Sequence, residues 1–193
     1  MIVVSSLRRS GSSMLMFALK EAGLDILGDK YFNETEQKKE GNLNGYWEVD
    51  DICTNTGLQE KMDGEAIKIM FEALSSSKPE LIDKLVFIFR QPRKMLSSVY
   101  KYNHIEHKDI FICKQAVDII DALSWTLYYN KQFRIFFYED IIAKPRQEMK
   151  RLIKFTGGDS KKAIKVIDKN WIEWKQLVII VNILICLRIF IIN

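Results

Sequence analysis

The most constraining feature of this sequence is an uninterrupted apolar run at residues 85–89, which is bounded by Lys84 and Arg90. An apolar run this short is typical of a strand that is buried on both faces of a parallel sheet. Parallel strands are joined by crossover connections, and these are usually helices. The run therefore favours an α/β fold in which helices cover both faces of a mostly parallel sheet.

Other segments of the chain fit the same fold. Further apolar segments of strand length lie at residues 1–5, 65–71 and 133–138. Apolar residues recur at helical spacing at 14–22, 92–100, 111–130 and 145–156. We predict a loop at 28–46, where periodicity is weak, and a short helix at 47–61. No repeat or low-complexity linker divides these segments, so we expect one three-layer α/β/α domain over residues 1–170.

Composition narrows the class of ligand. The chain carries 29 Lys and Arg against 25 Asp and Glu, a net charge of +4. This small excess favours anionic small ligands and does not point to nucleic acid as a partner. The three cysteines are odd in number and lack the spacing of a zinc site, so we predict neither a disulfide framework nor a metal. Because no secretory leader precedes the first strand, we predict a cytoplasmic protein.

The C-terminal segment, residues 171–193, differs from the rest of the chain. From residue 177 onward it is almost wholly apolar, interrupted only by Asn182, Arg188 and Asn193. Such a segment can be a buried terminal element, an extension that is not part of the native fold, or a membrane anchor. As a helix it would be somewhat short for the roughly 30 Å hydrocarbon core of a bilayer. We therefore favour the first two interpretations over membrane association.

A polar cluster follows the first predicted strand: Arg8, Arg9, Ser10, Gly11, Ser12 and Ser13 stand directly before a predicted helix. In an open parallel sheet this turn is the usual anion site, because the helix start presents unpaired N–H groups and the positive end of its dipole. Gly11 allows close approach of the backbone, the serines add hydroxyl donors and the arginines add charge. A capped helix start at the surface is the alternative, but it does not explain this combination of residues.

The same cluster resembles a known donor-binding loop. It lacks the GxxxxGK[ST] pattern of nucleoside triphosphate loops, which disfavours a typical NTPase. It is similar to the 5′-phosphosulfate loop of sulfotransferases that use 3′-phosphoadenosine 5′-phosphosulfate (PAPS), whose pattern is Pro-Lys/Arg-Ser-Gly-Thr/Ser-Thr/Ser after a strand. Arg9 falls on the basic position, and Arg8 replaces the usual proline. The resemblance implies a P-loop NTPase-like fold in which residues 8–13 bind the donor and Arg9 stabilises charge during transfer.

Two later segments strengthen this resemblance. Arg90 directly follows the buried strand and Ser98 lies eight residues further on, a spacing similar to that of the 3′-phosphate segment of the same sulfotransferases. An arginine fork and a hydroxyl suit a terminal phosphate, although a strand-terminal arginine reaching into solvent is common. Tyr138-Glu139-Asp140 resembles the Tyr-Glu-Asp stretch that these proteins carry after the fourth strand. We interpret Glu139 and Asp140 as capping and scaffold residues.

The sequence contains fewer signals for the residues that would lie near the acceptor. Residues 41–48 resemble an aromatic and acidic element of bacterial sulfotransferases, which makes Glu48 the candidate base that removes the acceptor proton. A helix-start carboxylate with no role in catalysis is an equally good interpretation of Glu48. His104 and His107 are interpreted as surface residues.

The resemblance implies a PAPS-dependent sulfotransferase of the EC 2.8.2 class that needs no metal. PAPS would be the co-substrate, and the acceptor would be a hydroxyl or amine on a small molecule, glycan or lipid. The alternatives are a P-loop-type small-molecule kinase and a truncated, noncatalytic nucleotide-binding protein. Binding of ATP with magnesium would indicate the first, and donor binding without transfer would indicate the second.

Overall fold

The computed structural model describes residues 1–28, 47–49, 52–102 and 108–167. The predictions for the loop at 28–46 and for the segment at 171–193 therefore lie wholly or almost wholly outside the described residues. So do His104 and His107.

The centre of the fold is a parallel sheet. Its strands are β1 (Ile2–Ser6), β2 (Ala66–Met70), β3 (Lys84–Phe89) and β4 (Gln132–Phe137), in the spatial order β2-β1-β3-β4. All three strand pairs are parallel, and Ser6 at the end of β1 is level with Met70 and Ile88 of its neighbours. The carboxyl ends of all four strands therefore meet at one edge of the sheet.

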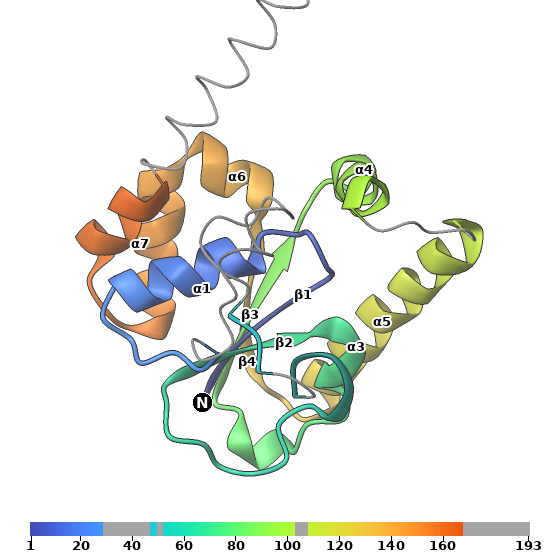
Figure 1. The fold of residues 1–193 in the computed structure, drawn as a ribbon. Helices are drawn as coiled ribbons and strands as arrows, with labels where there is room; N and C mark the ends of the chain where they lie inside the picture. Colours follow the sequence, from blue (N-terminus) through green and yellow to red (C-terminus); the bar gives the residue numbers. More distant parts are fainter. Residues whose placement is uncertain (29–46, 50–51, 103–107, 168–193) are drawn as a thin grey trace, which may run out of the picture.

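Helices cover both faces of this sheet. One face carries α1 (Ser12–Glu21), α6 (Tyr138–Ala143), α7 (Pro145–Thr156) and a helix at 160–167. The other face carries α3 (Phe71–Leu74), α4 (Pro92–Tyr102) and α5 (Lys108–Tyr128). Figure 1 shows α1 and α7 on one side of the strands and α3 and α5 on the other. The prediction of a three-layer α/β fold is confirmed.

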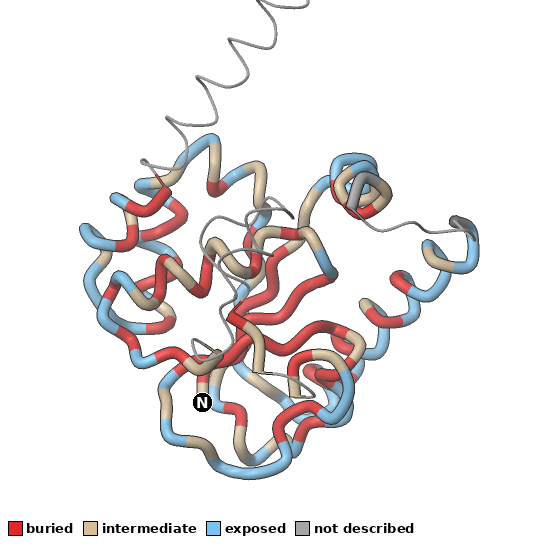
Figure 2. Tube along the Cα trace, viewed as in Figure 1, coloured by how far each residue is buried: buried red, intermediate tan, exposed pale blue. Residues whose placement is uncertain are grey.

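Two apolar cores lie between these layers. Strand side chains alternate in direction, so that Val4, Val86 and Phe136 pack with α1 and α7, while Val3 and Phe87 pack with α3, α4 and α5. The strands β1, β2 and β3 are almost continuously buried, as Figure 2 shows, whereas most residues of β4 at the edge of the sheet are half-buried or exposed. Lys68 in the middle of β2 differs from the other buried strand residues, because its side chain is charged although it is only 1% exposed.

The strand order creates a switch point at the carboxyl edge. After β1 the chain passes to α1 on one face, and after β3 it passes to α4 on the other face. Because β1 and β3 are neighbours, their connections diverge between them. Ligands of open α/β sheets bind at such a switch point.

The predicted helix at 47–61 is wrong. In its place the structure has a π-helical turn, η2 (Ile52–Thr56), followed by irregular chain. Gly57 has a φ of 62°, and a Cβ there would lie 2.5 Å from the Ala73 carbonyl oxygen. The Leu58 N–H donates to Ser77 Oγ at 2.9 Å. This segment is shaped by packing against α3 and the turn that follows it, which local periodicity does not report.

Two short helices, α3 and α6, were not predicted, because four to six residues are too few to show a helical period. None of the helices in the described part of the chain combines the length and hydrophobicity of a membrane-spanning segment.

Candidate functional site

The loop between β1 and α1 forms the centre of the candidate site. Arg9 and Gly11 both have left-handed backbone conformations, with φ of 64° and 98°. A Cβ at Gly11 would lie 2.5 Å from Tyr138 Cδ2, so only glycine fits there. Within the described part of the chain, no side chain caps the start of α1. The loop therefore leads directly into a helix N-terminus of the kind that binds anions.

Side chains from β3 and α4 reach this loop. Arg90 Nη1 donates to the Arg9 carbonyl oxygen at 3.0 Å, and Arg9 Nε donates to Ser98 Oγ at 3.1 Å. The two polar segments predicted from the sequence thus converge at the switch point. This arrangement follows from the pairing of β1 with β3, which places the ends of these two strands side by side.

The ring of Tyr138 packs against the Arg90 side chain. The Arg90 guanidinium carbon lies 4.7 Å from the centre of the Tyr138 ring, which is a cation–π contact. Burial raises the pKa of Tyr138, and the opposing influence of Arg90 does not cancel this effect. Both carboxylate oxygens of Glu139 accept from the Gln91 N–H, at 3.2 and 3.3 Å, which fixes the chain after β3.

The Arg90 side chain also has an unused donor. Its Nε is buried and makes no hydrogen bond within the described residues. A buried donor without a partner costs free energy, and a guanidinium is a strong partner for phosphate oxygens. The residues present therefore fit an anionic ligand between β1 and β3.

The opposite side of the loop, toward β2, contains an ion pair. Lys68 Nζ donates to Glu48 Oε1 at 2.7 Å and to Ser13 Oγ at 3.4 Å. Trp47 holds Glu48 in place, because its indole ring stacks on Phe17 of α1 with 6.1 Å between ring centres. Burial raises the pKa of the nearby Cys53 thiol to about 12, against the lowering influence of Lys68. A lysine ammonium thus lies beside the start of α1.

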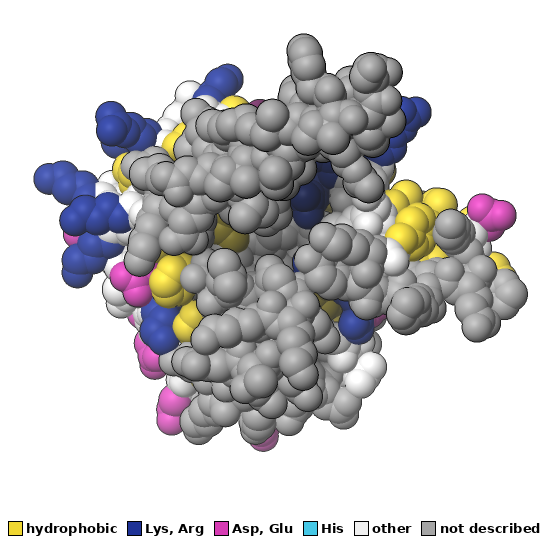
Figure 3. All heavy atoms as spheres, turned by 45° about the horizontal axis from the view of Figure 1, so that its top comes forward, with side chains coloured by type: hydrophobic (Ala, Val, Ile, Leu, Met, Phe, Trp, Pro, Cys, Tyr) yellow, Lys and Arg dark blue, Asp and Glu magenta, His cyan; other side chains and the backbone are white. Residues whose placement is uncertain are grey.

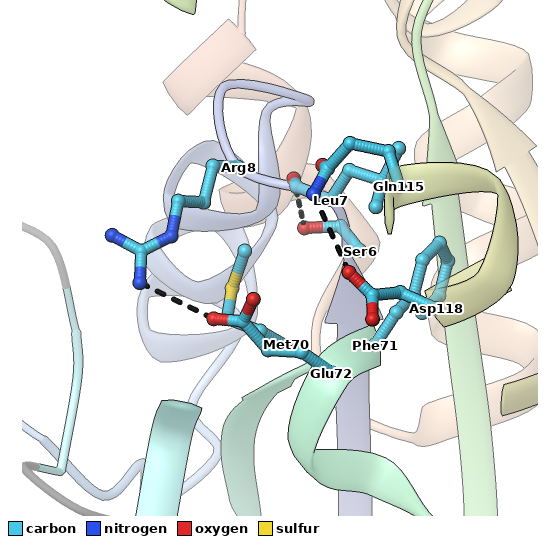
Figure 4. A pocket seen from close by; sticks show the side chains of 8 residues that line it. All are labelled: Ser6, Leu7, Arg8, Met70, Phe71, Glu72, Gln115 and Asp118. Carbon is cyan, nitrogen blue, oxygen red and sulfur yellow. Dashed lines mark hydrogen bonds and ion pairs between the residues drawn. The ribbon is translucent and has the colours of Figure 1, made fainter. Parts of the chain in front are cut away.

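Arg8 points away from the loop. Its guanidinium pairs with Glu72 of α3 at 3.2 Å, and its side chain is 52% exposed. Arg8 and Glu72 line a small, open pocket together with Asp118 and Gln115 of α5. Figure 4 shows Arg8 directed at Glu72 on one side of this pocket and Gln115 directed at Asp118 on the other.

The predicted site residues thus separate into groups. The loop residues Ser10, Gly11, Ser12 and Ser13 lie at or just before the start of α1, and Arg9, Arg90 and Ser98 are in contact. Arg8 lies on the pocket side. Glu48 lies beside Lys68 and directly before the turn in which the Cys53 N–H donates to the Val49 carbonyl oxygen, so both interpretations of Glu48 stay predictions.

Lys68 is the residue that sequence reasoning missed. The available signal was a single lysine in the middle of an otherwise apolar strand segment, 66–70. A charged residue is almost never fully buried without a partner, so a lysine within such a segment indicates a specific contact. In the described ranges, no group of three or more His, Cys, Asp or Glu side chains lies together as potential metal ligands.

Comparisons with known proteins agree with this fold. The sequence profile of the sulfotransferase domain matches residues 1–175. Mouse sulfotransferase SULT7A1, solved in complex with PAP, superposes with a TM-score of 0.52 at 17% identity, over 86% of this chain and 62% of the other.

A second solved structure is retinol dehydratase in complex with androsterone and the inactive cofactor PAP. Its TM-score is 0.52 at 14% identity, over 86% of this chain and 63% of the other. The chain thus spans under two thirds of the length of these structures, and the likeness shows a shared fold. Among curated proteins, none matches the sequence significantly.

Proposed function

The chain belongs to the sulfotransferase family, and from this we propose that it transfers the sulfuryl group of PAPS to a hydroxyl or amine of a small-molecule acceptor. The observation that carries the proposal is the convergence of Arg9, Arg90 and Ser98 at the switch point of the sheet. Two arginines and a hydroxyl from separate segments form one site that suits a ligand with two anionic ends.

The described residues suggest how the donor is held. Arg90, with its unused buried Nε, and Ser98 bind the 3′-phosphate that distinguishes PAPS from ATP. Residues 10–13 and the first N–H groups of α1 bind the 5′ end. The Arg8 side chain is directed at Glu72, so we assign it no contact with the donor.

PAPS supplies the sulfuryl group, and the protein supplies charge and a base. Negative charge grows on the oxygen that leaves with the nucleotide, and Arg9 and the α1 start stabilise it. Lys68 is a further cation for this task, because its ammonium lies 3.4 Å from Ser13 Oγ in the donor loop. Glu48 removes the acceptor proton; its side chain is 41% exposed, so an acceptor can reach it.

The acceptor would lie on the β2 side of the loop, between Glu48 and the pocket beside Arg8. That a related fold is solved with androsterone supports a small-molecule acceptor. Glycan and lipid acceptors carry the same hydroxyl chemistry and remain within the proposed class.

Donor binding provides the direct test. We expect PAP, 3′-phosphoadenosine 5′-phosphate, to raise the melting temperature of the protein without added metal. Arg90→Ala should weaken PAP binding by about 10- to 100-fold, because a hydrogen bond to a charged group contributes roughly 1.5–3 kcal/mol. ATP affinity should change little, since ATP lacks the 3′-phosphate. Isothermal titration calorimetry measures both, with exposed Arg93→Ala, three residues further on at the start of α4, as the matched control.

Three results would contradict the proposal. Equal losses of PAP and ATP would remove Arg90 from the 3′-phosphate site. Stabilisation by ATP with magnesium but not by PAP would indicate a kinase. Intact PAP binding without transfer of labelled sulfate from PAPS to any member of a metabolite mixture would indicate a noncatalytic nucleotide-binding protein.

A further inference from the structure

Helix α5 carries an exposed apolar stripe that the fold does not use. Ile110, Val117, Ile120 and Leu127 are between 53% and 69% exposed. Exposed Cys113 and Ser124 fill the gaps between them. The six positions follow one another at alternating intervals of three and four residues, which is the heptad spacing of helices that pack against other helices. We call these six residues the α5 seam. Figure 3 shows hydrophobic side chains at the surface over this part of the molecule.

The opposite side of α5 already anchors the helix. Ala122 and Trp125 are buried in the core against β3 and α3, and Thr126 is buried with them. The helix is therefore formed before any partner arrives, and pairing along the seam costs little conformational entropy. Isolated exposed apolar residues are normal on protein surfaces, but a contiguous apolar stripe marks an interaction site.

We propose that the α5 seam binds the same seam of a second copy of this chain, with the two helices antiparallel. In this register Ile110 packs against the partner's Leu127, Val117 against the partner's Ile120, and Cys113 against the partner's Ser124. Each contact occurs twice, as two-fold symmetry requires. The apolar layers are then complementary in both halves of the interface.

Charge along the seam is complementary to that of a second copy, and the helix dipoles favour the antiparallel orientation. Lys114 and Asp121 flank the seam on the same side, at equivalent positions of successive heptads. In an antiparallel pair Lys114 faces the partner's Asp121, so two opposite-charge pairs form. Lys114 is 58% exposed although it also pairs with Glu72 and Asp118. In a parallel pair Lys114 would face the partner's Asp109 and Asp121 would face the partner's Ala116, so charge alone allows both orientations. The helix dipoles would be aligned unfavourably in the parallel pair, and this favours the antiparallel one.

The size of the seam sets the expected strength. One pair of three-heptad helices lies near the low end of the roughly 1,200–2,000 Å² that stable interfaces bury. We therefore expect a dimer with a dissociation constant of about 1 μM, which corresponds to a binding free energy of about −8 kcal/mol. The seam lies on the face of α5 away from the sheet and includes none of the proposed donor residues, so this inference stands independently of the proposed function.

The oligomeric state of the full chain tests the proposal. Sedimentation equilibrium at about 100 μM protein, well above the expected dissociation constant, should give close to twice the mass of one chain for the wild type. Ile120→Lys should shift this mass toward that of a monomer. Its dissociation constant should be at least about 50-fold higher than that of the wild type, because each lysine would face an apolar layer of the partner helix. Ile112→Lys is the matched control, because Ile112 lies on the same helix, is 43% exposed and is outside the seam. It should remain dimeric, and circular dichroism should show that both variants are folded.

A monomeric wild type, or equal dissociation of both lysine variants, would overturn the inference. Disulfide formation tests the relative orientation of the two α5 helices. With Cys186→Ser as background, Ser124→Cys should form an intermolecular disulfide with Cys113 under mild oxidation, whereas Gln147→Cys on α7 should not. Dimers linked through Cys113 alone would overturn the antiparallel arrangement. An intrachain Cys113–Cys186 disulfide in a wild-type monomer would assign the seam to the chain's own C-terminal segment and overturn the pairing.

Discussion

The two sides of the β1 loop use cations in different ways. On the β3 side, Arg90 contacts a backbone carbonyl and an aromatic ring, and within the described residues no carboxylate pairs with its guanidinium. On the β2 side, Lys68 is paired with Glu48, and Arg8 is paired with Glu72. The β3 side keeps positive charge for a ligand, whereas the β2 side already balances its cations with carboxylates.

This difference would suit two different tasks at one edge of the sheet. An arginine without a carboxylate partner is suited to binding a permanently charged phosphate. A lysine and a carboxylate in contact are suited to managing a charge and a proton that change during a reaction. We therefore expect substitutions on the β3 side to affect donor affinity and substitutions on the β2 side to affect turnover.

The largest effect should come from Lys68→Met. This variant keeps most of the side-chain volume in β2 and removes the ammonium beside the donor loop. We expect kcat to fall by about 100- to 1,000-fold, the usual loss when one charge-stabilising donor is removed, while the affinity for PAP changes by less than about threefold. Steady-state kinetics and calorimetry measure the two quantities.

Exposed Lys78→Met is the matched control for this experiment and should retain wild-type kcat. If Lys68→Met loses PAP affinity and retains kcat, the assignment of the β2 side to turnover is wrong. Glu48→Gln should also lose turnover and retain PAP binding, because it removes the proposed base and leaves the β3 side unchanged.

A smaller effect is expected from Ser98→Ala on the β3 side. The variant removes the hydroxyl that accepts from Arg9 Nε, and a hydrogen bond of this kind contributes roughly 1–2 kcal/mol. PAP should therefore bind about 5- to 20-fold more weakly, with kcat at saturating donor almost unchanged. The neighbouring exposed residue offers the control Ser97→Ala, which should bind PAP as the wild type does. A drop in kcat without a loss of affinity would break the comparison.

The last prediction concerns the reactivity of the thiols and involves no change in kcat or in PAP affinity. Cys53 lies buried on the β2 side, where burial raises its pKa to about 12, whereas Cys113 is exposed on α5. Only the thiolate reacts with alkylating reagents. At pH 8 we expect Cys113 to react with iodoacetamide at least about a thousandfold faster than Cys53, as measured by mass spectrometry of peptides. Comparable rates would show that water reaches the β2 side of the site freely.

Local patterns in the sequence were enough to predict most of the elements. The apolar runs that became β1 and β3 and the helical periods that became α1, α5 and α7 are each contained within a few turns of chain. The Ser-Gly-Ser-Ser cluster also specified its chemistry locally, because a helix start with these residues suits an anion wherever it is placed. The segment at 47–61 was mispredicted because its backbone bonds to Ser77, which periodicity does not encode.

The relation between the two donor segments was decided only by the tertiary structure. Arg9 and Arg90 are 81 residues apart, and they meet because β1 pairs with β3 on one side and with β2 on the other. The same pairing places Lys68 beside Glu48 and turns Arg8 toward Glu72. The sequence by itself determined which residues can carry charge and where strands and helices form. The order of the strands decided which charges face a ligand and which face each other, because hydrogen bonding between distant strands depends on the packing of the whole chain.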